Sequence, residues 1–141
     1  MSRSGYSEEL GGFELNMWRG AVSAAIKGKR GQAFIVEAIC ALDAMPSKRL
    51  ITDSLQDPAR GEFCTLGVVG ASRGMDMVAL KNVDPEEIGK AFGISKAMSA
   101  EIMFINDDYG ESEGNNREKQ ERRWSRMRCW LESNLLEPKT R

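Results

Sequence analysis

The chain has 141 residues, of which 41% are hydrophobic and 29% charged, and its formal net charge is −1. This composition is ordinary for a globular protein with one core and is too apolar for global disorder. The sequence contains no histidine, which excludes Ser-His-Asp and Cys-His catalysis and removes the commonest metal ligand. We therefore expect a protein that is not an enzyme and that needs no cofactor or metal.

The three cysteines are Cys40, Cys64 and Cys129, and none belongs to a Cys-x-x-Cys pair. An odd set with this spacing excludes a complete set of intrachain disulfides and any standard zinc pattern. Cys40 lies within an apolar run, so a buried free thiol is expected. No window approaches 18 uninterrupted apolar residues, and the N-terminus lacks the apolar region of a signal peptide. A cytoplasmic protein without membrane contact is expected.

The N-terminal half of the chain predicts two helices. Residues 1–11 show no periodicity and are expected to be flexible, residues 12–137 to form a single helical domain, and residues 138–141 to form a tail. Helical spacing begins near residue 13, and KGKRG interrupts it. The run QAFIVEAICALDAM then predicts a second helix, apolar almost all round and central in the domain, which ends before Pro46. Two helices joined by a short Gly-containing turn predict an antiparallel helical hairpin.

Residues 50–74 carry weaker patterns. The segments RLITDSL and EFCTLGVV are short and β-branched or apolar, and the turn-forming sequence QDPARG separates them. A small β-hairpin is favoured, although a helix remains open. Gly67, Gly70 and Gly74 lack the Gly-Lys-Ser/Thr ending of a phosphate-binding loop, so we expect them to form turns or close contacts.

The stretch EEIGKAFGISKAMSAEI has the shape of a helix-turn-helix. Asp84 and Pro85 begin the first helix, Gly93 ends it, and Ser95 caps the second. The second helix carries Lys96 as its only cation and ends in aspartates, which phosphates would repel. An ordinary helical corner is therefore favoured over a DNA reader. The segment DDYGESEGNN that follows is acidic, Gly-rich and poor in apolar residues, so a mobile loop is expected. Its carboxylates do not match the order of a calcium loop, so a solvated acidic loop is favoured over a calcium site.

Charge is distributed unevenly along the chain. Residues 61–116 carry four basic and ten acidic side chains, whereas residues 117–141 carry eight basic and four acidic ones. Such a chain could be self-complementary, or it could present two faces to two partners. The first candidate binding surface is the cationic turn KGKR, with Lys27, Lys29 and Arg30, which could meet a phosphate or an acidic protein surface. The alternative is a solvated helix junction.

The second candidate surface is the last predicted helix, over residues 118–136. An apolar stripe should dock it on the core, and it comprises Trp124, Met127, Leu131 and Leu135. Cations gather on another side with Trp130 beside them, namely Lys119, Arg122, Arg123 and Arg126. An exposed tryptophan among arginines is typical of an interface hot spot. The alternative is that Trp130 widens the buried stripe.

Five segments in this order carry a family resemblance: WRGAVSAAIKGKRGQAF, ALDAMPSKRLI, FCTLGVVGASRG, KAFGISKAMSAEIMFINDD and RRWSRMRCWLE. Over residues 18–132 the chain resembles a family of small uncharacterised proteins encoded by tailed bacteriophages and prophages. The resemblance implies a bacterial cytosol, an infection cycle and a dispensable accessory gene. It transfers no functional residue.

These observations together predict a mainly α fold, a single small domain of about five helices with an optional short β-hairpin. The favoured function is that of a phage accessory protein that binds a host macromolecular complex stoichiometrically, for instance as an anti-CRISPR-like or other inhibitor of bacterial defence. The alternative is a nucleic-acid-binding regulator that uses its basic helix surfaces. Eight methionines and three tryptophans are also compatible with a homodimer.

Overall fold

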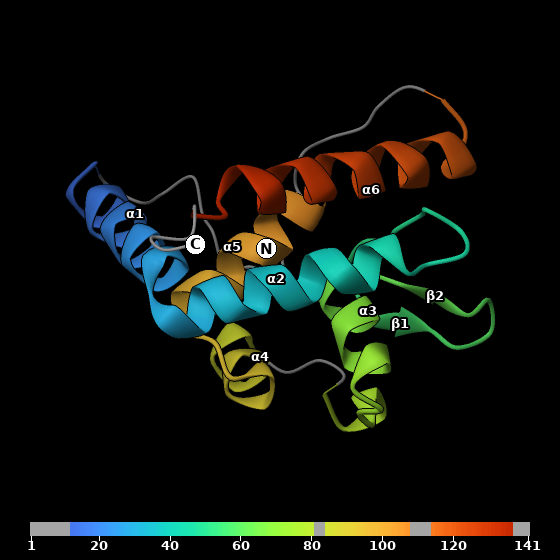
Figure 1. The fold of residues 1–141 in the computed structure, drawn as a ribbon, viewed down its shortest axis with the longest axis horizontal. Helices are drawn as coiled ribbons and strands as arrows, with labels where there is room; N and C mark the ends of the chain where they lie inside the picture. The colour runs from blue at the N-terminus through green and yellow to red at the C-terminus, as the bar shows by residue number, and fades with distance from the viewer. Residues whose placement is uncertain (1–11, 81–83, 108–113, 137–141) are drawn as a thin grey trace, which may run out of the picture.

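The computed structural model describes residues 12–80, 84–107 and 114–136. Within these ranges it is mainly α-helical with one short β-hairpin (Figure 1), as predicted. The elements are α1 (Gly12–Lys27), α2 (Lys29–Asp43), β1 (Gln56–Asp57), β2 (Glu62–Phe63), α3 (Thr65–Ser72), the 3₁₀ helix η1 (Met77–Leu80), α4 (Pro85–Phe92), α5 (Lys96–Asp107) and α6 (Asn116–Ser133). The predicted flexible N-terminus and C-terminal tail lie outside the described residues. None of the helices described is long and apolar enough to cross a membrane.

The first two helices meet at a corner, so the predicted antiparallel hairpin is wrong. Gly28 alone separates α1 from α2, and Figure 1 shows the two helices diverging from it. The corner is tight because Gly31 lies directly against the last turn of α1. A Cβ atom at Gly31 would lie 2.0 Å from the carbonyl oxygen of Ala25. With no loop to turn the chain back, α1 packs on α5, while α2 packs on α3 and α6.

Helix α2 buries one face only, which corrects two expectations. Its buried side chains include Phe34, Ile35 and Leu42, but Val36 is 49% exposed. Cys40 is exposed as well, so the expected burial of its thiol is wrong. The reason is that α3 and α6 pack on one face of α2, while the face with Val36 and Cys40 stays open to solvent. Because the residues of this open face are also apolar, the sequence does not show which face is exposed.

The predicted hairpin is confirmed, but only for four residues. Gln56 pairs with Phe63 and Asp57 with Glu62, across a turn that ends at Gly61. The apolar run that follows is helix α3 rather than a strand. Cys64 caps this helix, because its Sγ accepts a hydrogen bond from the backbone N–H of Gly67 at 3.4 Å. Gly67 is a close-packing glycine, as expected, since a Cβ there would lie 1.8 Å from the carbonyl oxygen of Leu55.

The corner between α4 and α5 agrees closely with the prediction. The Asp84 carboxylate accepts the N–H of Glu87, Gly93 ends α4 with φ +77°, and Ser95 accepts the N–H of Met98. Helix α5 is the central helix of the molecule, enclosed by its neighbours in Figure 1 and buried along most of its length. Ser99 is fully buried and donates to the carbonyl oxygen of Pro85 at 2.5 Å. Because a recognition helix needs an open face, α5 is structural.

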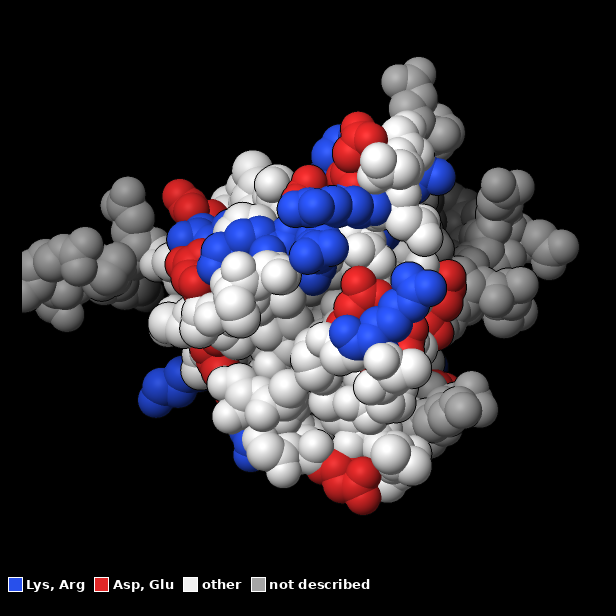
Figure 2. Space-filling view, turned by 90° about the vertical axis from the view of Figure 1, so that its right-hand side faces the viewer, with Lys and Arg blue, Asp and Glu red and all other residues white. Residues whose placement is uncertain are grey.

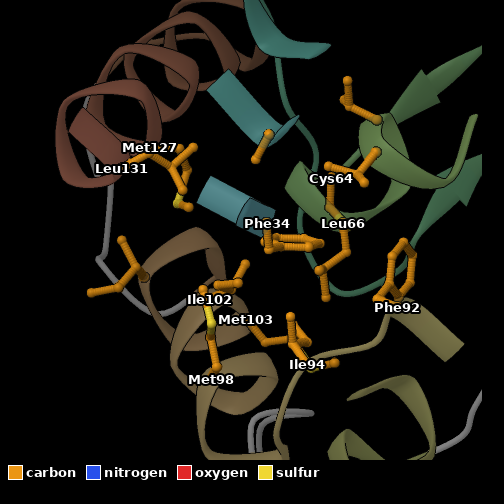
Figure 3. Close-up of a cluster of buried hydrophobic side chains, with 14 of the residues drawn as sticks. Phe34, Cys64, Leu66, Phe92, Ile94, Met98, Ile102, Met103, Met127 and Leu131 are labelled. Carbon is orange, nitrogen blue, oxygen red and sulfur yellow. The ribbon is translucent and has the colours of Figure 1, made fainter. Parts of the chain in front are cut away.

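One hydrophobic cluster joins the helices. Figure 3 shows side chains of α2, α3, α5 and α6 converging, among them Phe34, Leu66, Ile102 and Met127. On α6, Met127 and Leu131 are fully buried, as the apolar stripe predicted. Leu135 is 39% exposed, because α6 ends at Ser133 and the stripe ends with it.

An arginine at the end of α3 ties three helices together. Arg73 donates to both carboxylate oxygens of Glu37 on α2, at 2.7 Å each, and to the carbonyl oxygen of Phe92 on α4 at 3.1 Å. Its guanidinium also lies over the rings of Phe34 and Phe92. The hydrogen bonds from Arg73 hold the pKa of Glu37 below its ordinary value of 4.5.

Replacing Glu37 with glutamine should therefore destabilise the protein in a pH-dependent way. A carboxyl with a lowered folded-state pKa contributes stability above its ordinary pKa and loses it as the pH falls through the folded value. We expect Glu37→Gln to cost about 1 kcal/mol at pH 7, because the pair is partly exposed. The difference from wild type should shrink as the pH falls below 4.5. Urea denaturation at several pH values measures this, and a pH-independent difference would contradict it.

Candidate functional site

Two of the four cations predicted to gather on one side of α6, Arg123 and Arg126, are bonded to other parts of the fold. Helix α6 begins at a capping box that Asn115 and Glu118 form. The guanidinium of Arg123 donates to the carbonyl oxygen of Leu50 at 2.7 Å. The guanidinium of Arg126 donates to the carbonyl oxygen of Ile105, in the last turn of α5, at 3.4 Å. Carbonyl groups at helix ends lack ladder partners, so a cation is favourable there. These two arginines hold α6 in place.

The structure consequently separates the residues that the sequence grouped on α6. Arg122 is exposed, whereas Arg123 and Arg126 are half-buried. Trp130 is half-buried and packs against the hydrophobic cluster. Its neighbour in space is the basic end of α1, where Lys27 lies. Lys27 and Trp130, which the sequence placed on two separate candidate surfaces, therefore line one site.

They meet in a groove between α1 and the C-terminal part of α6, which we call the α1–α6 groove. Its volume is about 340 Å³. Val22 and Ile26 are core residues at its base, and Trp18 and Trp130 line it from α1 and α6. Its remaining lining residues include Arg19, Lys27, Glu101 and Leu136. The groove is thus of mixed character, with two tryptophans, two cations and one carboxylate, Glu101. Aromatic walls beside cations are suited to a side chain that is apolar and lies beside a negative charge.

Gln32 holds three residues that line the groove. Its side-chain N–H groups donate to the carbonyl oxygens of Ile26 at 2.8 Å and Asn134 at 3.0 Å, and its side-chain oxygen accepts the N–H of Leu136 at 2.9 Å. These hydrogen bonds hold the residues that follow α6 against the junction between α1 and α2. The sequence offered one indication of this role, because Gln32 is one of only three polar residues in the apolar run of α2.

The other two polar residues of that run have the same kind of role. Glu37 binds Arg73 of α3, and Asp43 binds Arg128 of α6 through two hydrogen bonds of 2.8 and 3.1 Å. The Arg128 guanidinium lowers the pKa of the Asp43 carboxyl. Each of the three polar side chains in the apolar run of α2 thus joins the helix to another part of the fold.

The cations at the groove and corner face solvent. Arg19, Lys27, Lys29 and Arg30 are all exposed. None of the four appears in an ion pair within the described ranges. Lys29 and Arg30 lie at the corner beyond the groove, so the structure brings only Lys27 of the predicted KGKR set into contact with it.

The described residues contain no group of three or more histidine, cysteine, aspartate or glutamate side chains that could hold a metal ion. The chain is thus a small mainly helical protein with a tryptophan-lined, cation-edged groove. No family model, curated protein or solved structure matches it.

Proposed function

We propose that the protein acts by stoichiometric binding to a macromolecular partner and that the α1–α6 groove is its binding surface. The observation that carries the proposal is the meeting of Trp130 with Lys27 and Arg19 at one groove. Tryptophan and arginine dominate the energetics of protein interfaces, particularly where they are partly enclosed. The exposed cations of the α1–α2 corner extend the same positive surface and would attract an acidic partner.

The partner we propose is a host protein complex in the bacterial cytoplasm, and the protein is a phage accessory factor that inhibits it. Inhibition of a bacterial defence system, in the manner of an anti-CRISPR protein, is the specific form we favour. The family resemblance over residues 18–132 supports this context. The absence of histidine from the whole sequence supports binding over catalysis, because the commonest general base is missing.

The alternative is a nucleic-acid-binding regulator. The exposed cations Lys27, Lys29 and Arg30 favour it, since lysine and arginine neutralise phosphates. Against it, α5 offers no open face, and Arg123 and Arg126 are already bound to backbone carbonyl groups. We therefore place nucleic-acid binding second.

A pull-down of the tagged protein from bacterial lysate, with and without nuclease, tests the proposal. We expect a near-stoichiometric host protein that survives nuclease treatment. The double variant Arg19→Glu with Lys27→Glu should reduce its recovery more than tenfold, because it reverses the charge at the groove. The matched control is Lys90→Glu with Arg117→Glu, which changes the net charge equally at exposed positions outside the groove.

Each other outcome has a definite meaning. Undiminished capture by the groove variant would show that another surface binds the partner. Partners that vanish with nuclease would favour the regulator. A blank in both arms would contradict the proposal. Circular dichroism of both double variants should match that of the wild type, which shows that any loss is not a loss of folding.

A further inference from the structure

A second and larger hollow lies at the hairpin end of the molecule, and we call it the hairpin cavity. It has a volume of about 710 Å³ and lies between residues 51–62 and the N-terminal half of α6. This volume is within the range of about 300–1,000 Å³ that small-molecule sites occupy. Its lining includes the accessible apolar side chains Ile51, Val78 and Leu80, as well as the buried side chains Leu55, Ile88 and Met103. The cavity therefore offers an apolar surface to a ligand.

The wall formed by residues 50–55 is held open by bonds to other parts of the fold. This segment has no regular secondary structure. The N–H of Leu50 donates to the carbonyl oxygen of Gln120 at 3.2 Å, and the Asn106 side chain donates to the carbonyl oxygen of Ile51 at 2.9 Å. The N–H of Asp53 donates to a carboxylate oxygen of Asp107 at 3.2 Å. Residues 50–55 are thus bonded to both α5 and α6, and they cannot move into the cavity without breaking these hydrogen bonds.

Asp53 gives a second sign that this wall is constrained. Its φ is +67°, and it is the only non-glycine residue with a positive φ in the part of the chain that the structure describes. This conformation costs energy for a residue with a Cβ, and it persists only where the surroundings impose it. Strain of this kind is concentrated at ligand-binding and other functional positions.

Charges of both signs line the cavity. Lys119 and Arg123 project from α6 one turn apart, and the facing segment carries Arg60 together with Asp53, Asp57 and Glu62. Lys119 is half-buried, and none of the side-chain bonds within the described ranges involves it. Figure 2 views the molecule from this end and shows lysine and arginine intermixed with aspartate and glutamate. A half-buried cation without an ion-pair partner among the described residues favours an anionic ligand group.

We infer that the hairpin cavity binds a small monocarboxylate with an apolar body. The carboxylate lies at Lys119, and the apolar body covers Ile51, Val78 and Leu80. A polyphosphate or a nucleic-acid backbone does not suit the cavity, because three carboxylates offset the three cations of its lining and leave no net positive charge for several negative charges. A single anionic head avoids the carboxylates by lying on the α6 side. This inference does not depend on the α1–α6 groove or on its partner.

Titration with straight-chain alkanoates tests the inference, with the protein observed by two-dimensional NMR. Butanoate, hexanoate, octanoate and decanoate are compared below their micelle-forming concentrations. Each added methylene that enters the cavity should raise the affinity about fourfold. The rise should stop once the cavity is filled, which distinguishes a bounded site from adsorption to a surface. The shifted resonances should include Leu55, Met103 and Lys119.

Two variants and one uncharged ligand test the roles of charge and space. Octanoate should bind wild type about tenfold more tightly than 1-octanol, which lacks the negative charge. Lys119→Glu should remove this preference, whereas Lys96→Glu, an equal charge change at an exposed position outside the cavity, should keep it. Val78→Trp should weaken octanoate and 1-octanol alike by partly filling the cavity. Val78 is 68% exposed, so the variant should still fold.

Three results would overturn the inference. They are an affinity that does not depend on chain length, resonance shifts confined to residues outside the cavity, and an unchanged preference for octanoate in a folded Lys119→Glu protein. None of these measurements involves the α1–α6 groove. A negative titration would therefore not contradict the proposed partner binding, and a negative pull-down would not contradict binding of a ligand in the hairpin cavity.

Discussion

Replacing Gly31 with alanine should destabilise the protein by about 3 kcal/mol and lower its melting temperature by about 10 °C. The added Cβ would lie 2.0 Å from the carbonyl oxygen of Ala25 and 2.9 Å from that of Ile26. Both obstacles are backbone atoms in the last turn of α1, so no side chain can rotate away to make room. Relief requires α1 to move off α2. Urea denaturation followed by circular dichroism measures the loss.

Gly20→Ala is the matched control, because Gly20 also lies within a helix. A Cβ at Gly20 would meet nothing within 4 Å, and the residue is exposed. Alanine there should stabilise the protein by about 0.5–1 kcal/mol, since glycine loses more backbone entropy on folding. The glycine-to-alanine substitution is therefore expected to lower the free energy of unfolding in one helix and to raise it in the adjoining one. A Gly31→Ala protein as stable as wild type would show that the corner is looser than its geometry indicates.

The elements that could be predicted from the sequence are those decided by local interactions. Helix α4 has its cap at Asp84, its first-turn proline at Pro85 and its left-handed terminus at Gly93, all within ten residues. Such signals act over one helical turn, so they are present in the sequence itself. The same is true of the capping serine of α5. The corner that these helices form was predicted in its correct position.

Helix α3 could not be predicted because its pattern has no period. Residues 65–70 are all buried, and a segment apolar on every side fits a buried strand as well as a buried helix. The choice depends on distant contacts. Gly67 lies against Leu55, and the N–H of Cys64 donates to the carbonyl oxygen of Leu55 at 3.1 Å. These contacts belong to the tertiary fold and leave no local pattern.

The candidate site was partly predictable for a related reason. Lys27 and Trp130 were each recognisable from residue type and spacing, but their proximity arises from the packing of α6 beside α1. Arg123 and Arg126 do share one side of α6, as their spacing requires. The carbonyl oxygens of Leu50 and Ile105 that they face come from elsewhere in the chain. Helical periodicity indicates which residues share a face and does not indicate what covers it.

Replacing Asn106 with aspartate should cost about 3 kcal/mol at pH 7, although the two side chains have nearly the same shape. Asn106 is 1% exposed. Its side-chain oxygen accepts the N–H and the hydroxyl of Thr65, at 3.1 and 2.8 Å. Its side-chain nitrogen donates to the carbonyl oxygen of Ile51 at 2.9 Å and to a carboxylate oxygen of Asp107 at 2.8 Å. In the variant, an ionised oxygen would replace that nitrogen and face two acceptors.

The penalty should depend on pH, which separates this cause from a general loss of packing. Burial and the facing acceptors raise the pKa of the new carboxyl in the folded state above the unfolded value of about 3.9. The deficit relative to wild type should therefore be smallest below pH 4, where the protonated group can donate to Ile51 as the amide does. It should grow with pH until the folded-state pKa is passed.

Asn116→Asp is the matched control for this experiment. Asn116 is exposed and lies at the first position of α6, where a negative charge is favourable to the helix dipole. We expect it to be neutral or to stabilise the protein by about 0.3–1 kcal/mol at pH 7. Urea denaturation of both variants and wild type at pH 4 and pH 7 makes the comparison. An Asn106→Asp deficit equal at the two pH values would mean that shape and not charge determines this position. A deficit that appears only at pH 7 would show that the neutral amide of Asn106 is what joins α5 to α3 and to the wall of the hairpin cavity.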